Sequence, residues 1–276
     1  MVVLVVIQDD IRQKSISSLK FLEIEKQIKF LYARLFCYSQ IRYQVMSAFF
    51  TTLEQETEKA WNKIYTGSFW QHLRHHGLDR GLYTCLMTQI YGFTKYNAQN
   101  QALAGAKVTS ERLNLLRFCL EHAFEEAGHD LMVLNDLEKV GVDRETVINT
   151  SLLPTTQAFI AYVFRISTEY DATARLGYSY WAENSYSYLK ELTDAMRHDL
   201  ELPDKYMTFF VAHSEIDRKH LQEVVEAISD WCVTSEQQSD LIEVLKTTLN
   251  LTGSIFNQVY EQYVEQQSLK RLSLSV

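Results

Sequence analysis

The stretch His213-Ser-Glu-Ile-Asp217-Arg-Lys-His220 sets two imidazoles and one carboxylate at offsets of zero, four and seven residues. In a helix with 3.6 residues per turn, side chains at these offsets lie on one side of the helix. Imidazole and carboxylate groups on one helix face are typical of a metal site. An exposed polar face with a chance pattern is the alternative, but apolar neighbours such as Phe209 and Ile216 favour an inward orientation.

A second segment, Glu121-His-Ala-Phe-Glu-Glu-Ala-Gly-His129, carries a matching set of donors. His122, Glu126 and His129 repeat the spacing of four and then three residues, and Glu126 with His129 forms the carboxylate–histidine pair of di-iron helix bundles. Two further roles stay open. Glu125 is either a ligand or an exposed ion-pair partner, and His122 is either a ligand or a hydrogen-bonded core histidine.

A third donor is Glu183, which lies in the aromatic stretch Gly177-Tyr-Ser-Tyr-Trp-Ala-Glu183-Asn-Ser-Tyr-Ser-Tyr. A carboxylate buried there without a partner would carry a large desolvation penalty, which a bound metal ion would offset. Glu183 could also bridge two metal ions. The alternatives are a salt bridge to an arginine, or Glu169 in the same role. The combined donors are nitrogen and oxygen without thiolate, which suits iron or manganese better than structural zinc, and their number fits two metals.

The composition predicts one large all-α domain. The chain has 276 residues, of which 46% are hydrophobic, enough for a single substantial core. Two prolines and nine glycines are too few for a sandwich or barrel that turns every ten residues. A net charge of −8 argues against a nucleic-acid partner, because no basic stripe is available to neutralise phosphates. A small-molecule substrate is therefore expected.

Residues 1–45 are expected to form an N-terminal extension with an amphipathic helix at 18–38, and residues 46–276 one domain. The apolar run at residues 1–7 is too short to span a membrane and lacks a basic flank, so no membrane partner is expected. Four cysteines without CxxC spacing favour the reducing cytoplasm. A homodimer is possible from the sequence.

Hydrophobic periodicity predicts a series of helices with short breaks between them. The predicted helices cover residues 49–64, 78–98, 110–140, 143–150, 155–169, 172–192, 203–231 and 235–270.

The order and spacing of the donor segments resemble a known family. The segments are His122-x2-Glu125-Glu126-x-Gly-His129-Asp-x5-Asp136-Leu-x3-Gly141, Leu176-Gly-Tyr-x4-Glu183 and His213-x3-Asp217-x2-His220. Over about residues 50–235 the chain is similar to the iron-containing redox enzymes, the heme-oxygenase-like di-iron oxidases of the TenA/PqqC-like fold superfamily.

The resemblance implies a heme-oxygenase-like multi-helix bundle and an oxygen-activating oxidoreductase. It further implies two Fe²⁺ ions, O2 as co-substrate, and a small substrate of the amino-acid or fatty-acid type. The implied iron ligands are Glu126, His129, Glu183, His213, Asp217 and His220. Several family members have a glutamate where this chain has His122, so Glu126 or Glu125 must supply the carboxylate of that helix.

Other relatives of this fold give the alternatives. A metal-free TenA-like enzyme needs a reactive cysteine, and only Cys232 lies near the His213 segment in sequence. Heme oxygenases need a glycine-rich helix over the heme, whereas residues 172–192 contain only Gly177. A metal-free PqqC-like enzyme and a non-catalytic helical binding protein, whose polar cluster is only a hydrogen-bond network, also remain open.

The substrate pocket is expected among aromatic residues. Tyr162 and Tyr180 are the principal candidates, and the wider group adds Phe159, Tyr178 and Tyr186. A substrate carboxylate would need a cationic anchor, for which periodicity does not distinguish Arg165, Arg175 and Arg197.

Overall fold

The computed structural model describes residues 45–274, with side chains for residues 45–211 and 219–273. The chain divides into two compact units, Met1–Thr51 and Thr52–Val276. In the first unit the described residues, 45–51, are helical. The amphipathic helix predicted for 18–38 lies outside the described residues, and the domain boundary predicted after residue 45 stays a prediction.

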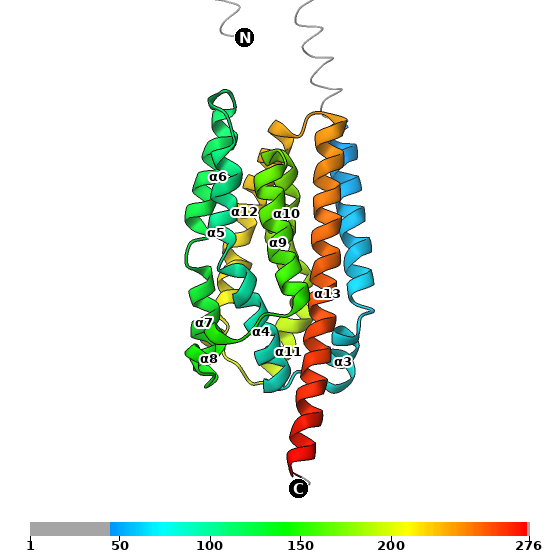
Figure 1. The fold of residues 1–276 in the computed structure, drawn as a ribbon. Helices are drawn as coiled ribbons and strands as arrows, with labels where there is room; N and C mark the ends of the chain where they lie inside the picture. The colour runs from blue at the N-terminus through cyan, green and yellow to red at the C-terminus, as the bar shows by residue number, and fades with distance from the viewer. Residues whose placement is uncertain (1–44, 275–276) are drawn as a thin grey trace, which may run out of the picture. The chain divides into compact units, whose positions relative to one another are not determined.

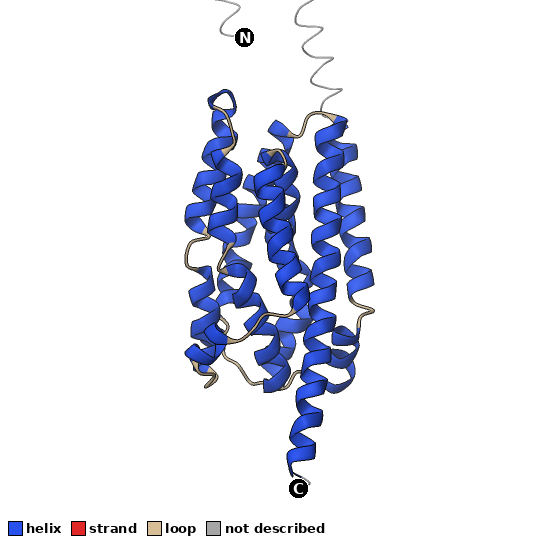
Figure 2. Cartoon of the chain, viewed as in Figure 1, coloured by secondary structure: helices blue, strands red, loops and turns tan. Residues whose placement is uncertain are grey.

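The second unit is a bundle of helices, and its described residues contain no strand (Figures 1 and 2). The all-α prediction is therefore confirmed. After helical residues 52–64 the unit contains α3 (Ser68–His76), α4 (Arg80–Thr94), α5 (Asn97–Ala106), α6 (Leu113–Glu125), α7 (His129–Lys139), α8 (Arg144–Asn149), α9 (Pro154–Glu169), α10 (Ala172–Ser185), α11 (Lys190–Asp199), α12 (Thr208–Trp231) and α13 (Ser235–Leu274). None of the described helices is long and apolar enough to cross a membrane.

The central helix is α10, which packs against α13, α12, α9 and α5. Every residue from Ala172 to Trp181 is buried, so the helix has no solvent face in this part. Small residues let its neighbours approach closely. A Cβ on Gly177 would lie 2.3 Å from the carbonyl oxygen of Leu241 on α13, so only glycine fits at this crossing.

Two ion-paired or buried carboxylates fix the starts of helices. Asp171 accepts hydrogen bonds from the backbone N–H of Thr173 at the start of α10, and from Arg112, just before α6, at 2.8 and 2.9 Å. Asp136 of α7 is fully buried and accepts from the Thr208 hydroxyl at 2.7 Å and from the backbone N–H of Phe209 at 2.9 Å. Asp136 thereby satisfies donors at the start of α12 that have no partner within their own helix.

The main correction to the predicted helices concerns residues 110–140, which form two helices instead of one. The helix α6 ends at Glu125, and α7 begins at His129. Gly128 between them has φ of +101°, a left-handed conformation that stops a right-handed helix. The helix predicted for 78–98 also ends early, at Thr94, before α5 begins. The helices predicted at 155–169 and 235–270 are confirmed to within a few residues.

We expect Gly177→Ala to lower the free energy of unfolding by about 3 kcal/mol, because the added methyl group overlaps backbone atoms that cannot move aside. Urea denaturation followed by circular dichroism measures the change. Gly253→Ala on α13 is the control. Its new Cβ would meet only a side-chain atom of Ile64, at 3.0 Å, and the change should stay within about 1 kcal/mol. Equal losses in the two variants would contradict the close crossing.

The Arg112–Asp171 pair should make stability depend on pH in the acid range. Hydrogen bonds from Arg112 to Asp171, helped by those from Thr173, lower the pKa of Asp171 to about 2. A lowered carboxyl pKa contributes stability above the unfolded value of about 4, and that contribution is lost as the pH falls toward about 2.

Two substitutions separate the ion pair from the helix cap. Asp171→Asn keeps a capping side chain and should cost about 0.5 kcal/mol at neutral pH, because the pair is half-exposed. Asp171→Ala should cost about 1 kcal/mol more, since the cap is lost too. The wild-type advantage over Asp171→Asn, measured by urea denaturation, should shrink below about pH 4. An advantage independent of pH would rule out the ion pair as its source.

Candidate metal centre

The α6–α7 junction brings three of the predicted donors together. His122 lies in the last turn of α6, Glu126 caps the helix, and His129 is the first residue of α7. The expected continuous helix through His129 is therefore wrong. The turn at Gly128 nevertheless leaves His129 Nδ1 3.4 Å from Glu126 Oε2, so the carboxylate–histidine pair forms across a break in the helix.

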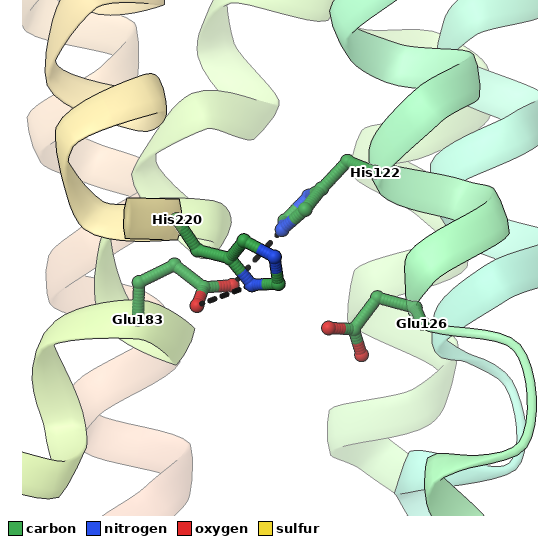
Figure 3. Close-up of side chains that lie close together, drawn as sticks. All are labelled: His122, Glu126, Glu183 and His220. Carbon is green, nitrogen blue, oxygen red and sulfur yellow. Dashed lines mark hydrogen bonds and ion pairs between the residues drawn. The ribbon is translucent and has the colours of Figure 1, made fainter. Parts of the chain in front are cut away.

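Glu183 of α10 points toward α6 and α12 from the centre of the bundle (Figure 3). Its Oε1 lies 3.0 Å from Nε2 of His122, and its Oε2 lies 3.5 Å from Nδ1 of His220. All three residues are at most 5% exposed. Glu183 is thus enclosed between two imidazoles from different helices.

One donor atom from each of His122, Glu126, Glu183 and His220 lies within 4.8 Å of the others, and we call these four residues the inner cluster. Its side chains come from α6 and its C-terminal cap, from α10 and from α12, and they face one another in Figure 3. His122, which the sequence left open as ligand or core histidine, belongs to this cluster.

The composition of the inner cluster suits a divalent metal ion. In the part of the chain whose side chains are described, the ion-pair partners of Glu126 and Glu183 are histidines, with no lysine or arginine. The Nδ1 atom of His122 is buried and has no hydrogen-bond partner among the described atoms. Arg175 interacts with both carboxylates through space, but no described lysine or arginine forms an ion pair with either, and such carboxylates are costly to bury unless a cation is supplied. Nitrogen and oxygen donors of this kind match iron or manganese.

Both carboxylates of the inner cluster are held in the ionised form. Burial opposes ionisation of Glu126, but the hydrogen bond and charge of His129, with help from His122 and Asn97, lower its pKa to about 2. Burial likewise opposes ionisation of Glu183, yet hydrogen bonds from His122 and His220 lower its pKa below the usual value. The cluster therefore presents two negative charges at neutral pH.

A hydrogen-bond chain that sequence analysis missed orients Glu126. The amide of Asn97, the first residue of α5, donates to Glu126 Oε2 at 3.0 Å. The Tyr178 hydroxyl of α10 donates in turn to Asn97 Oδ1 at 2.8 Å. No spacing pattern in the sequence singles out Asn97, because its role depends on α5 and α6 packing side by side.

The remaining predicted ligands lie in different places. The backbone at His213 and Asp217 belongs to α12, but their side chains lie outside the described residues, so their ligand roles stay predictions. Glu125 is outside the inner cluster. Its Oε2 lies 3.2 Å from Nε2 of His220, and its Oε1 lies 3.5 Å from the Lys219 ammonium.

A largely apolar cavity of about 100 Å³ adjoins the inner cluster and includes Glu126 and Glu183 in its wall. Among the described residues that line it, none is lysine or arginine. The rest of the wall consists of Trp61, Leu86, Ile90, Phe93, Thr94, Asn97, Phe159, Trp181, Ala182, Ser185, Tyr186, Leu189, Phe209, Phe210, Thr252, Ile255 and Phe256.

The two principal tyrosine candidates for the substrate pocket do not line this cavity. Tyr162 of α9 is hydrogen-bonded to Thr247 of α13, and the Tyr180 side chain lies near Glu54 and Tyr188. Each side chain therefore lies beside a different part of the bundle from the cavity wall. Of the wider aromatic group, Phe159 and Tyr186 do line the cavity.

The structure also distinguishes the surroundings of the three arginines that were candidates to anchor a substrate carboxylate. Arg165 and Arg197 are exposed and paired with Glu169 and Asp204. Arg175 is buried, and its guanidinium donates to Ser167, Ser179 and Asn100. Because these side chains and the face of the Tyr178 ring already surround it, Arg175 is a structural cation of α10.

Comparison with known proteins identifies the family. The model of the iron-containing redox enzyme family matches residues 85–253, more than half of the chain. The chain belongs to this family. The resemblance based on its sequence motifs is thereby confirmed. No curated protein matches the chain.

Solved structures show the same fold. A domain of unknown function with a heme oxygenase-like fold from Shewanella denitrificans OS217 is 40% identical, with a TM-score of 0.76, over 79% of this chain and 95% of that one. A TenA homolog from Pseudomonas syringae pv. tomato DC3000 is 14% identical, with a TM-score of 0.66, over 78% of this chain and 93% of that one.

A heme oxygenase from the cyanobacterium Synechocystis sp. PCC6803, in complex with heme, is 13% identical. Its TM-score is 0.63, over 83% of this chain and 99% of that one. The predicted heme-oxygenase-like fold is confirmed.

We expect Gly128→Ala to lower the free energy of unfolding by about 1 kcal/mol or more, because alanine disfavours the positive φ of this turn. No atom lies within 4 Å of the added Cβ, so backbone strain alone is tested. Gly128→Asn should lose less, since asparagine tolerates the left-handed region. Urea denaturation compares the two variants, and equal stability of Gly128→Ala and wild type would contradict the turn geometry.

Proposed function

We propose that this protein is an oxygen-dependent oxidoreductase with a non-heme di-iron centre, which acts on a small organic substrate. The observation that carries the proposal is the inner cluster. Four nitrogen and oxygen donors from three helices, three of them buried and Glu126 nearly so, converge beside an apolar cavity, within a family of iron-containing redox enzymes.

The residues that would hold the metals are His122, Glu126, Glu183 and His220, with His129, His213 and Asp217 as further ligands. Bound iron would supply the capacity to activate dioxygen and to oxidise the substrate. The protein residues contribute ionised carboxylates, fixed imidazoles and a cavity that excludes water. Asn97 and Tyr178 hold Glu126 in position through their hydrogen-bond chain.

The cavity favours a substrate with an apolar chain. Aromatic and aliphatic side chains dominate its described wall, which offers no cationic side chain to a carboxylate or phosphate. Of the two substrate types that the family resemblance implies, the fatty-acid type fits this lining better than an amino acid, because most of its surface is an apolar chain; the wall offers its carboxylate no cation, and a volume of about 100 Å³ holds only a short chain.

The three cysteines among the described residues do not favour a thiaminase-like mechanism, which is the alternative. Cys85, Cys119 and Cys232 are all buried. Burial raises the pKa of Cys85 and Cys119 to about 11 and that of Cys232 to about 12. Since the thiolate is the nucleophile, these three thiols are poorly suited to covalent catalysis.

The proposal predicts that anaerobic titration with Fe²⁺ loads about two ions per chain, the number that a di-iron centre requires. His122→Ala and His220→Ala should each weaken binding at least tenfold, by removal of a ligand imidazole. His75→Ala is the control, because His75 is exposed on α3 and should leave binding unchanged.

When the iron-loaded protein is exposed to oxygen, it should consume oxygen, and addition of an apolar carboxylic acid should increase the rate of consumption. Absence of iron uptake by the wild-type protein, or equal uptake in all three histidine variants, would end the proposal.

A further inference from the structure

A second, polar groove adjoins the inner cluster at His122, which does not line the apolar cavity. It lies between α6 and α12 and has a volume of about 710 Å³. His122 and Glu125 lie in its wall, so the groove extends from the surface to the edge of the inner cluster.

The described lining of this groove carries a net negative charge, which favours cations. Its described lining contains five acidic residues, Glu121, Glu125, Glu223, Glu226 and Asp230, against two basic ones, Arg117 and Lys219. A concave surface of one sign raises the local concentration of ions of the opposite sign and speeds their association. In the apolar cavity, by contrast, Glu126 and Glu183 are the only charged residues among the described lining, so no other charge in this lining attracts a hydrated ion.

Donor atoms of Glu125 and Glu223, which line the groove, and of the buried His220 lie within 4.8 Å of one another. We call these three residues the outer cluster. The imidazole of His220 is shared, since Nδ1 faces Glu183 of the inner cluster and Nε2 faces Glu125 of the outer one. His122 is a second link. It is buried, lines the groove, and has an Nδ1 atom without a hydrogen-bond partner among the described atoms.

A cation of the protein itself already occupies the outer cluster. The Lys219 ammonium lies 3.5 Å from Glu125 and 3.2 Å from Glu223. Lys219 is largely exposed and lies on a flexible stem, so it can move away at little cost when another cation arrives. Glu125 and Glu223 are thus neutralised by an exposed lysine that can be displaced, whereas the described ion-pair partners of Glu126 and Glu183 are histidines.

We propose that Glu125, Glu223 and Nε2 of His220 form an outer position that a divalent metal ion occupies only in transit. Through this position ferrous ion enters from the groove and passes to the inner cluster, and Lys219 is the cation that it displaces. This inference rests on the proposed function, since it supposes that the inner cluster binds iron. Carboxylate oxygens and one imidazole suit Fe²⁺ or Mn²⁺. His220 gives the two positions a residue in common.

The test is the rate at which metal-free protein takes up Fe²⁺ under anaerobic conditions, measured by stopped-flow competition with a coloured ferrous chelator. Glu223→Gln should slow uptake about threefold to tenfold at low ionic strength, and Lys219→Met should accelerate it. Both effects should shrink as salt is added. The amount of iron bound at equilibrium should equal that of the wild-type protein, because neither residue belongs to the inner cluster.

Glu261→Gln is the matched control, since it removes the same charge from an exposed position on α13. It should leave the uptake rate unchanged. Wild-type rates in both Glu223→Gln and Lys219→Met would overturn the entry route while leaving the proposed function intact. Equal slowing by Glu223→Gln and Glu261→Gln would also overturn it, because net charge alone would then explain the effect. Failure of the wild-type protein to bind iron would instead refute the proposed function.

Discussion

Two carboxylates buried side by side, Glu126 and Glu183, are the constraint on which the rest of this structure depends. Each lies in the apolar interior of a helical bundle, where an unpaired charge is costly. Among the described side chains their ionic partners are imidazoles alone, which come from α6, α7 and α12. Convergence of these helices around α10 makes the negative charges tolerable, and the arrangement is suited to a bound cation.

The sequence predicted the fold class and singled out residues that the structure brings together in the inner cluster, because both depend on local patterns. Helical periodicity is retained in α9 and α13, and the donors of α6 and α10 lie within short motifs. The break between α6 and α7 was missed because a single glycine inside an apolar pattern is compatible with a helix. Only the positive φ of Gly128 distinguishes a turn there.

Other features could not be predicted because they depend on contacts between distant segments. Asn97 reaches Glu126 only through the packing of α5 against α6. Tyr162 and Tyr180 belong to aromatic stretches but face other helices, which no count of aromatic residues reveals. The role of His122 was open for the same reason, since its contact with Glu183 joins residues 61 positions apart.

Asp136 has a consequence for the order in which the chain folds. It lies on α7 and accepts hydrogen bonds from Thr208 and Phe209, more than 70 residues later, at the first turn of α12. The opening donors of a helix have no partners within it, so this turn gains its acceptor only after α7 has docked. Closure of so long a loop makes such contacts slow to form. We therefore expect the first turn of α12 to become fixed only once α7 has docked, so this one contact joins the helix that carries His220 to the α6–α7 half of the site.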